Sequence, residues 1–150
     1  MGILKGGDPV SVGQPVEVGQ PFSDGVLWVT NSGSTDVILD GVSLIEQDPA
    51  IKLLGFYLKR DNRHSVGFNR GYTTRWGEQL RGSVVAPGKT VQIVLGLALS
   101  RRGSHVFRAI AVAYHTNSER TVMSIPSAAR MCAPRANYMG RCSAPEPLVR

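Results

Sequence analysis

The stretch PGKTVQIVLGLALSRRGSHVFRAIAVAYHTNSERTVMSI, residues 87–125, decides the fold class of this chain. Apolar residues alternate along residues 90–99 and again along 105–114, which is the period of an extended strand with one buried face. Pro87-Gly88 opens a turn before the first of these strands, and Arg101-Arg102-Gly103 breaks the chain before the second. The pattern predicts a β-hairpin and an all-β domain.

Further strands are predicted on both sides of this stretch, at residues 26–30, 36–45, 51–58 and 119–125. Gly41 interrupts the alternation in the second of them, which favours a bulge there. Short strands separated by turns at this spacing are typical of an immunoglobulin-like antiparallel β-sandwich, here of about seven strands. We expect an extended lead-in at 1–25, the sandwich at 26–125 and an irregular, proline-containing tail at 126–150. The best helix candidate, residues 127–131, is too short to stand alone.

Size and charge narrow the class of protein further. A chain of 150 residues is expected to form one domain with a full hydrophobic core. The formal net charge of +6 is concentrated in residues 59–81 and in the tail. Such basic segments on a nearly neutral body suit an anionic partner, or serve only as a solvated surface. No stretch has the ~18 apolar residues that a membrane span needs, and the first residues are too short for the apolar core of a signal peptide.

The long segment 59–83 has no clear period, and it is the candidate binding site. It combines arginines with aromatic residues, a mixture typical of interaction hot spots and of stacking on nucleic acid or sugar rings. The alternative is a loop folded back onto the sheet, with its aromatics buried and its arginines solvated. The predicted binding residues are Arg60, Arg63, Arg70, Tyr72, Arg75 and Trp76.

The tail carries the two cysteines of the chain, Cys132 and Cys142, and we expect them to form a disulfide. Free thiols and a metal site are the alternatives, but zinc would need two more ligands and no histidine lies nearby in sequence. The three histidines, His64, His105 and His115, are expected to be exposed or locally bonded. No catalytic motif, metal site or cofactor site is predicted.

Two aromatic residues of the predicted strands are expected in the core. Trp28 is expected to fill the space between two sheets. Tyr114 is expected to be buried, with its hydroxyl reaching the backbone.

Three segments together resemble bacterial immunoglobulin-like extracytoplasmic modules of uncharacterised membrane-anchored or secreted proteins. They are VLWVTNSGS at 26–34, APGKT at 86–90, and the strand that runs from Gly103 through Phe107 to Tyr114. The resemblance covers about residues 26–125. It implies a sandwich fold and a location outside the cytoplasm, and it implies no activity.

The predicted function is that of a non-enzymatic extracytoplasmic or cell-envelope module that contacts a protein or an anionic envelope polymer. Two alternatives stay open. One is a cytoplasmic nucleic-acid-binding β domain, favoured by the sequence pI near 9.8. The other is a subunit of a larger assembly whose termini add strands to its neighbours. The ligand, the oligomeric state and the natural start of the chain do not follow from the sequence.

Overall fold

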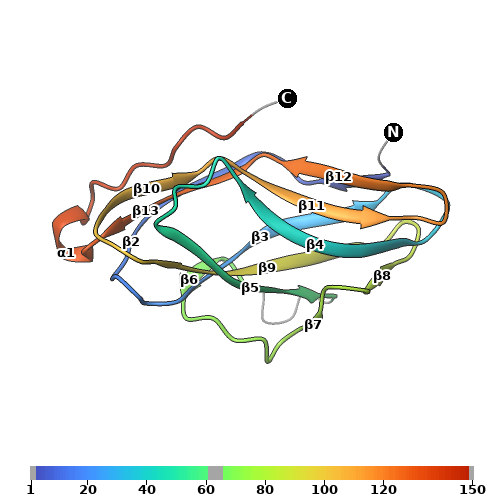
Figure 1. Ribbon diagram of the computed structural model, residues 1–150, viewed down its shortest axis with the longest axis horizontal. Coiled ribbons are helices and arrows are strands. Elements are labelled where there is room, and N and C mark those ends of the chain that lie inside the picture. The colour runs from blue at the N-terminus through green and yellow to red at the C-terminus, as the bar shows by residue number, and fades with distance from the viewer. Residues whose placement is uncertain (1–2, 61–65, 149–150) are drawn as a thin grey trace.

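The computed structural model describes residues 3–60 and 66–148, and within these ranges the chain is almost entirely β-structure (Figure 1). The expected all-β fold with antiparallel sheets is confirmed. Its elements are β1 (Leu4–Gly6), β2 (Val10–Pro15), β3 (Phe22–Asn31), β4 (Val37–Ile45), β5 (Ile51–Lys59), β6 (Phe68–Arg70), β7 (Glu78–Gln79), β8 (Val84–Val85), β9 (Thr90–Leu99), β10 (Gly103–Phe107), β11 (Ala109–His115), β12 (Arg120–Ile125), β13 (Ser127–Ala133) and α1 (Arg135–Tyr138).

The strands form two layers that pack face to face (Figure 1). The first layer is a six-stranded sheet in the order β1-β3-β9-β5-β7, with β6 added to β3. The second layer holds the four-stranded sheet β12-β11-β4-β8 and the three-stranded sheet β10-β13-β2. Among the described strands every pairing is antiparallel except that of β13 with β2. None of the helical structure in the described ranges has the length and apolar character needed to cross a bilayer.

Strand β9 lies at the centre of the first layer, paired with β3 on one side and β5 on the other. Its odd-numbered residues, from Val91 to Leu99, belong to the buried core between the layers. The intervening residues are buried as well, and Gln92 and Val94 are both 0% exposed. A strand buried on both faces reads as a nearly continuous apolar run. The outer face of this sheet must therefore also be covered.

The predicted hairpin of residues 90–99 with 105–114 is wrong. Strand β9 belongs to the first layer, whereas β10 pairs with β13 and β11 pairs with β4 and β12 in the second. Strands β9 and β10 both direct apolar residues into the same core, so the short turn between β9 and β10 carries the chain from one layer to the other. Alternation shows which face of a strand is buried, but it does not identify the neighbouring strand.

The second layer is built around a long hairpin that is interrupted once. Strand β10 pairs with β13 from Gly103↔Ala133 to Phe107↔Ala129, and β11 pairs with β12 from Ile110↔Ile125 onward. The register changes by one residue between the two halves, where Pro126 separates β12 from β13. Proline has no N–H to donate to a sheet, so a break at this position is expected.

The C-terminal tail is more regular than expected, and the lead-in is too. Residues 127–131, the helix candidate, lie in strand β13, which sits between β10 and β2. The helix of the tail is the short α1 instead. These terminal strands, with the short β6, β7 and β8, raise the number of strands above the expected seven. The predicted division into a lead-in at 1–25, a sandwich at 26–125 and a tail at 126–150 stays a prediction. Strand β2 of the lead-in and strand β13 of the tail nevertheless pair with each other.

The disulfide between Cys132 and Cys142 is confirmed, and it fastens the chain where the tail turns back over the second layer. The returning tail lies over β13 and β2 and then reaches Arg108, just after the end of β10. The Ser11 hydroxyl of β2 donates to the carbonyl of Pro145, and the Arg130 Nε of β13 donates to that of Ser143 at 2.9 Å. Beyond β10, the amide of Leu148 donates to the carbonyl of Arg108 at 3.0 Å.

Two of the three remaining expectations for the core hold. The predicted bulge is confirmed, because Gly41 and Leu39 pair with consecutive residues of β11. Tyr114 is 1% exposed, and its hydroxyl accepts from the amide of Leu4 at 3.5 Å. The prediction for Trp28 is wrong: it is only half-buried and lies outside the core cluster. Alternation along β3 turns Trp28 to the outer face, because Leu27 and Val29 on either side of it face the core.

Replacing Gly13 with alanine should lift the tail from β2. A Cβ on Gly13 would overlap the carbonyl of Cys142 and the backbone of Ser143, while the disulfide itself is unchanged. We expect a loss of about 1–3 kcal/mol in the free energy of unfolding and faster hydrogen exchange at the Leu148 amide. Gly41→Ala is the matched control, because a Cβ there meets nothing within 4 Å. Unchanged exchange at Leu148 in Gly13→Ala would contradict this packing.

Candidate functional site

The candidate site lies on the outer face of the six-stranded sheet. At this place, one row of residues across three neighbouring strands carries almost no side-chain atoms. In one row across the sheet, Ser23 of β3 pairs with Gly96 of β9, which pairs with Gly55 of β5. Because Leu95 and Leu97 point into the core, Gly96 faces outward. The row exposes a patch of bare backbone to the loop that follows β5. Glycine in a strand interior often marks such a place of close approach.

The ring of Tyr72 fills this patch. A Cβ built on Gly96 would lie 2.6 Å from Cγ and Cδ2 of Tyr72, and one built on Gly55 would lie 3.0 Å from its hydroxyl oxygen. The Gly96 contact is closer than van der Waals packing allows, so the ring lies against β9 only because that position is glycine. A Cβ at Gly55 would require a smaller shift of the Tyr72 hydroxyl end. Tyr72 also contacts Tyr57 of β5, with ring centroids 5.9 Å apart.

Backbone hydrogen bonds hold the described part of the loop against β3. Strand β6 pairs with the first residues of β3, and Phe68 packs on Phe22 with ring centroids 5.8 Å apart. The Ser23 hydroxyl donates to the carbonyl of Gly71 at 2.5 Å, and the amide of Gly71 donates to that of Pro21 at 2.8 Å. The predicted alternative, a loop folded back onto the sheet, therefore describes residues 66–77 better than a free loop does.

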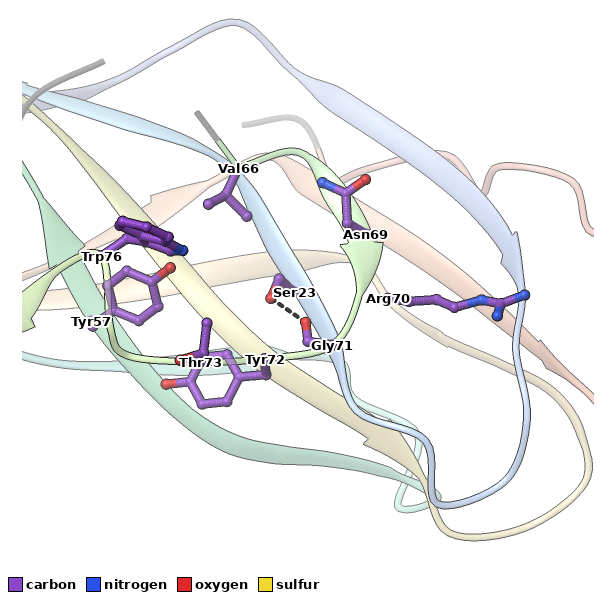
Figure 2. Close-up of a pocket in the computed structure, with 9 residues that line it drawn as sticks. All are labelled: Ser23, Tyr57, Val66, Asn69, Arg70, Gly71, Tyr72, Thr73 and Trp76. Atoms are coloured by element: carbon purple, nitrogen blue, oxygen red, sulfur yellow. Dashed lines mark hydrogen bonds between the residues drawn. The ribbon is translucent and has the colours of Figure 1, made fainter. Parts of the chain in front are cut away.

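A cavity of about 500 Å³ lies between the loop and the sheet (Figure 2). Figure 2 shows Trp76 and Tyr57 on one side of the cavity and Asn69 on the other, with Ser23 and Gly71 between them. The lining residues are Ser23, Tyr57, Val66, Asn69, Arg70, Gly71, Tyr72, Thr73 and Trp76.

Burial raises the pKa of both tyrosines of the cavity. Loss of hydration raises the pKa of Tyr57 above its ordinary value. Burial likewise raises the pKa of Tyr72, and the neighbouring Tyr57 adds to the shift because two phenolates would repel each other. Both hydroxyls stay protonated at neutral pH, so each can donate a hydrogen bond and neither serves as a base.

The predicted binding residues divide into three groups. Arg70, Tyr72 and Trp76 line the cavity, and the Arg75 guanidinium lies over the Trp76 ring, 4.6 Å from its centroid. Arg60 is not among the lining residues, and it forms an exposed ion pair with Glu78 at 2.9 Å.

The third group is a single residue, since Arg63 falls outside the described residues, as does His64. No observation tests binding by any of these residues, so their role stays a prediction. Tyr57 and the small residues of the floor were not among the predicted binding residues. The signal that pointed to them was the pair of glycines inside two strongly apolar strands.

The remaining polar clusters of the described residues are structural. His105 is buried, and its Nδ1 lies 2.8 Å from Asp48 Oδ2. The backbone amide of Ala50 and then His105 lower the pKa of that aspartate. His115 pairs with Asp40 in the same way, at 2.8 Å. In residues 3–60 and 66–148 no group of three or more His, Cys, Asp or Glu side chains is arranged to hold a metal ion.

Comparison with known proteins supports the β-sandwich fold alone. No family model matches the sequence, and no curated protein matches it. Among solved structures, a PapD-like (ASH) domain of human CEP192 is 12% identical, with a TM-score of 0.51 over 89% of this chain and 86% of that one. The VesB protease of Vibrio cholerae is 10% identical with a TM-score of 0.48; the match covers 87% of this chain but only 32% of the protease. The likeness to the PapD-like domain places this chain among β-sandwiches of that general shape.

The buried tyrosines predict a loss of stability at alkaline pH. The unfolded chain releases tyrosine protons near the ordinary pKa of 10.0, whereas the folded protein holds them to higher pH. The free energy of unfolding should thus be insensitive to these groups below about pH 10 and fall as the pH rises further. Tyr72→Phe should remove part of that fall in urea titrations at several pH values. Tyr138→Phe, in α1 and outside the cavity, is the control, and equal alkaline losses in both variants would count against a buried Tyr72.

Proposed function

We propose that this protein is a non-enzymatic binding module that works outside the cytoplasm, as an immunoglobulin-like domain of a bacterial cell envelope. Its partner is a protein or an anionic envelope polymer, held at the cavity between residues 66–77 and the first layer. The β-sandwich fold and the disulfide support this assignment, because disulfides persist mainly in oxidising compartments.

One observation carries the choice of site: an arginine–tryptophan pair sits at the rim of a cavity whose walls are already formed. Trp76 is 41% exposed, and Arg75 stacks on it. Tryptophan and arginine are the residues most enriched at binding hot spots. The cavity behind them is held by ring packing and backbone hydrogen bonds, so a partner need not order it on binding.

The cavity chemistry favours binding over catalysis. The lining residues that the structure describes include no histidine, cysteine or carboxylate. Burial raises the pKa of its two tyrosines further above neutral pH, so both hydroxyls are protonated there. A nucleophile paired with a base, the usual core of a hydrolytic site, has no counterpart among these lining residues.

The test removes the exposed pair without touching the packed rings. Immobilised protein is incubated, at physiological salt, with envelope proteins and with envelope polymers of the source cells as separate fractions. Arg75→Ala/Trp76→Ala should retain about tenfold less of the bound component than the parent, with a free energy of unfolding within about 0.5 kcal/mol of the parent. Arg102→Ala, an exposed arginine in the turn before β10, removes the same charge elsewhere and should bind normally.

Equal retention by the double variant and the parent would overturn the proposal. A single-stranded oligonucleotide serves as a third probe. If it alone binds, and if its affinity falls steeply between 50 and 200 mM salt, the nucleic-acid alternative replaces this one.

A further inference from the structure

The shape of the cavity limits what it can hold. Its volume of about 500 Å³ lies in the range of small-ligand sites rather than of flat protein interfaces. The loop from Val66 to Thr73 curves around one side of it, and β3 passes beneath (Figure 2). A compact bowl of this kind suits one ring-sized group better than an extended peptide strand, which needs an open sheet edge or a long groove.

The walls combine flat apolar surfaces with separate neutral polar groups. Trp76 is 41% exposed and supplies aromatic surface, whereas Tyr57 is only 3% exposed and is part of the packed wall behind it. The side-chain amide of Asn69 is a neutral polar group at the cavity, and within the described part of the chain no hydrogen bond engages it. An apolar ligand side chain would leave this amide unpaired, which costs binding energy. A sugar ring satisfies both demands, because its faces carry C–H groups that pack on aromatic rings and its edge carries hydroxyls.

Among the described residues, the charged side chains at the cavity are those of two arginines. Figure 2 shows the Arg70 guanidinium extending beyond the rim, away from the rings. The Arg75 guanidinium covers Trp76. None of the described residues that line the cavity is acidic. A carboxylate on the ligand would thus meet arginine just outside the bowl, and arginine binds carboxylates through paired hydrogen bonds.

We propose that the ligand is an acidic polysaccharide, with one sugar ring in the cavity against Trp76 and the carboxylate of a neighbouring uronic-acid residue at Arg70. The inference rests on the proposed function, since it names the ligand class of the same site. Trp76 packs against the sugar ring, and Arg70 binds the carboxylate. These two roles can be separated by experiment.

The experiment is a calorimetric titration with uronic-acid oligosaccharides and their carboxyl-reduced counterparts. The probes are a hyaluronan tetrasaccharide, tetragalacturonate and tetramannuronate. At least one acidic probe should bind about tenfold more tightly than its reduced form. Arg70→Ala should abolish that preference, and Arg70→Lys should restore part of it. Trp76→Ala should weaken acidic and reduced forms alike, while Arg102→Ala should change neither.

Three outcomes would overturn the inference. Equal affinity of the parent for acidic and reduced probes would remove the carboxylate from recognition. An acidic preference that survives Arg70→Ala would place the acid elsewhere. If no probe binds while an envelope protein is still retained in a Trp76-dependent way, the ligand is a protein and the proposed function stands; if that retention is absent too, both fail.

Discussion

The contact between the Tyr72 ring and the bare backbone at Gly55 and Gly96 determines the form of the candidate site. It lets a loop lie against a sheet whose central strand is apolar on both faces, and so it covers an outer surface that would otherwise meet water. The ring also supports Tyr57, which forms one wall of the cavity. A side chain at Gly96 would push the loop outward and open the cavity, because the neighbouring atoms in a packed interior have no free space to move into.

A glycine inside a strand also permits close packing of another segment on the other side of the sandwich. Gly13 in β2 leaves room for the backbone of Cys142 and Ser143, and the tail lies over β2 and β13. The disulfide anchors the start of that path. Irregular chain thus covers part of the outer face of each layer, and in both cases a glycine inside a strand permits the approach. The two coverings differ, since the tail packs flat whereas the loop leaves an open cavity between itself and the sheet.

The sequence predicted what local pattern can encode. Alternation located β4, β5 and β9 closely, and the break in alternation at Gly41 located the bulge. The pairing of strands was not predictable in this way, because β9 and β10 share a core without sharing a sheet. Strand β13 was missed since its sequence, Ser-Ala-Ala-Arg-Met-Cys-Ala, is poor in β-branched residues and gains its order from β2 and β10. Composition of the loop identified Tyr72 and Trp76, but the floor beneath them comes from strands distant in the chain.

The most direct test of this account is the proximity of the Tyr72 ring to Gly96 in solution. In a nuclear Overhauser spectrum of labelled protein, the account predicts cross-peaks from the aromatic protons of Tyr72 to the Hα protons of Gly96. It also predicts an unusual shift of those glycine protons, because they lie against the ring. Sharp, random-coil signals for residues 66–77, with no cross-peaks between Tyr72 and Gly96, would show that the loop does not cover the sheet and that the cavity does not exist.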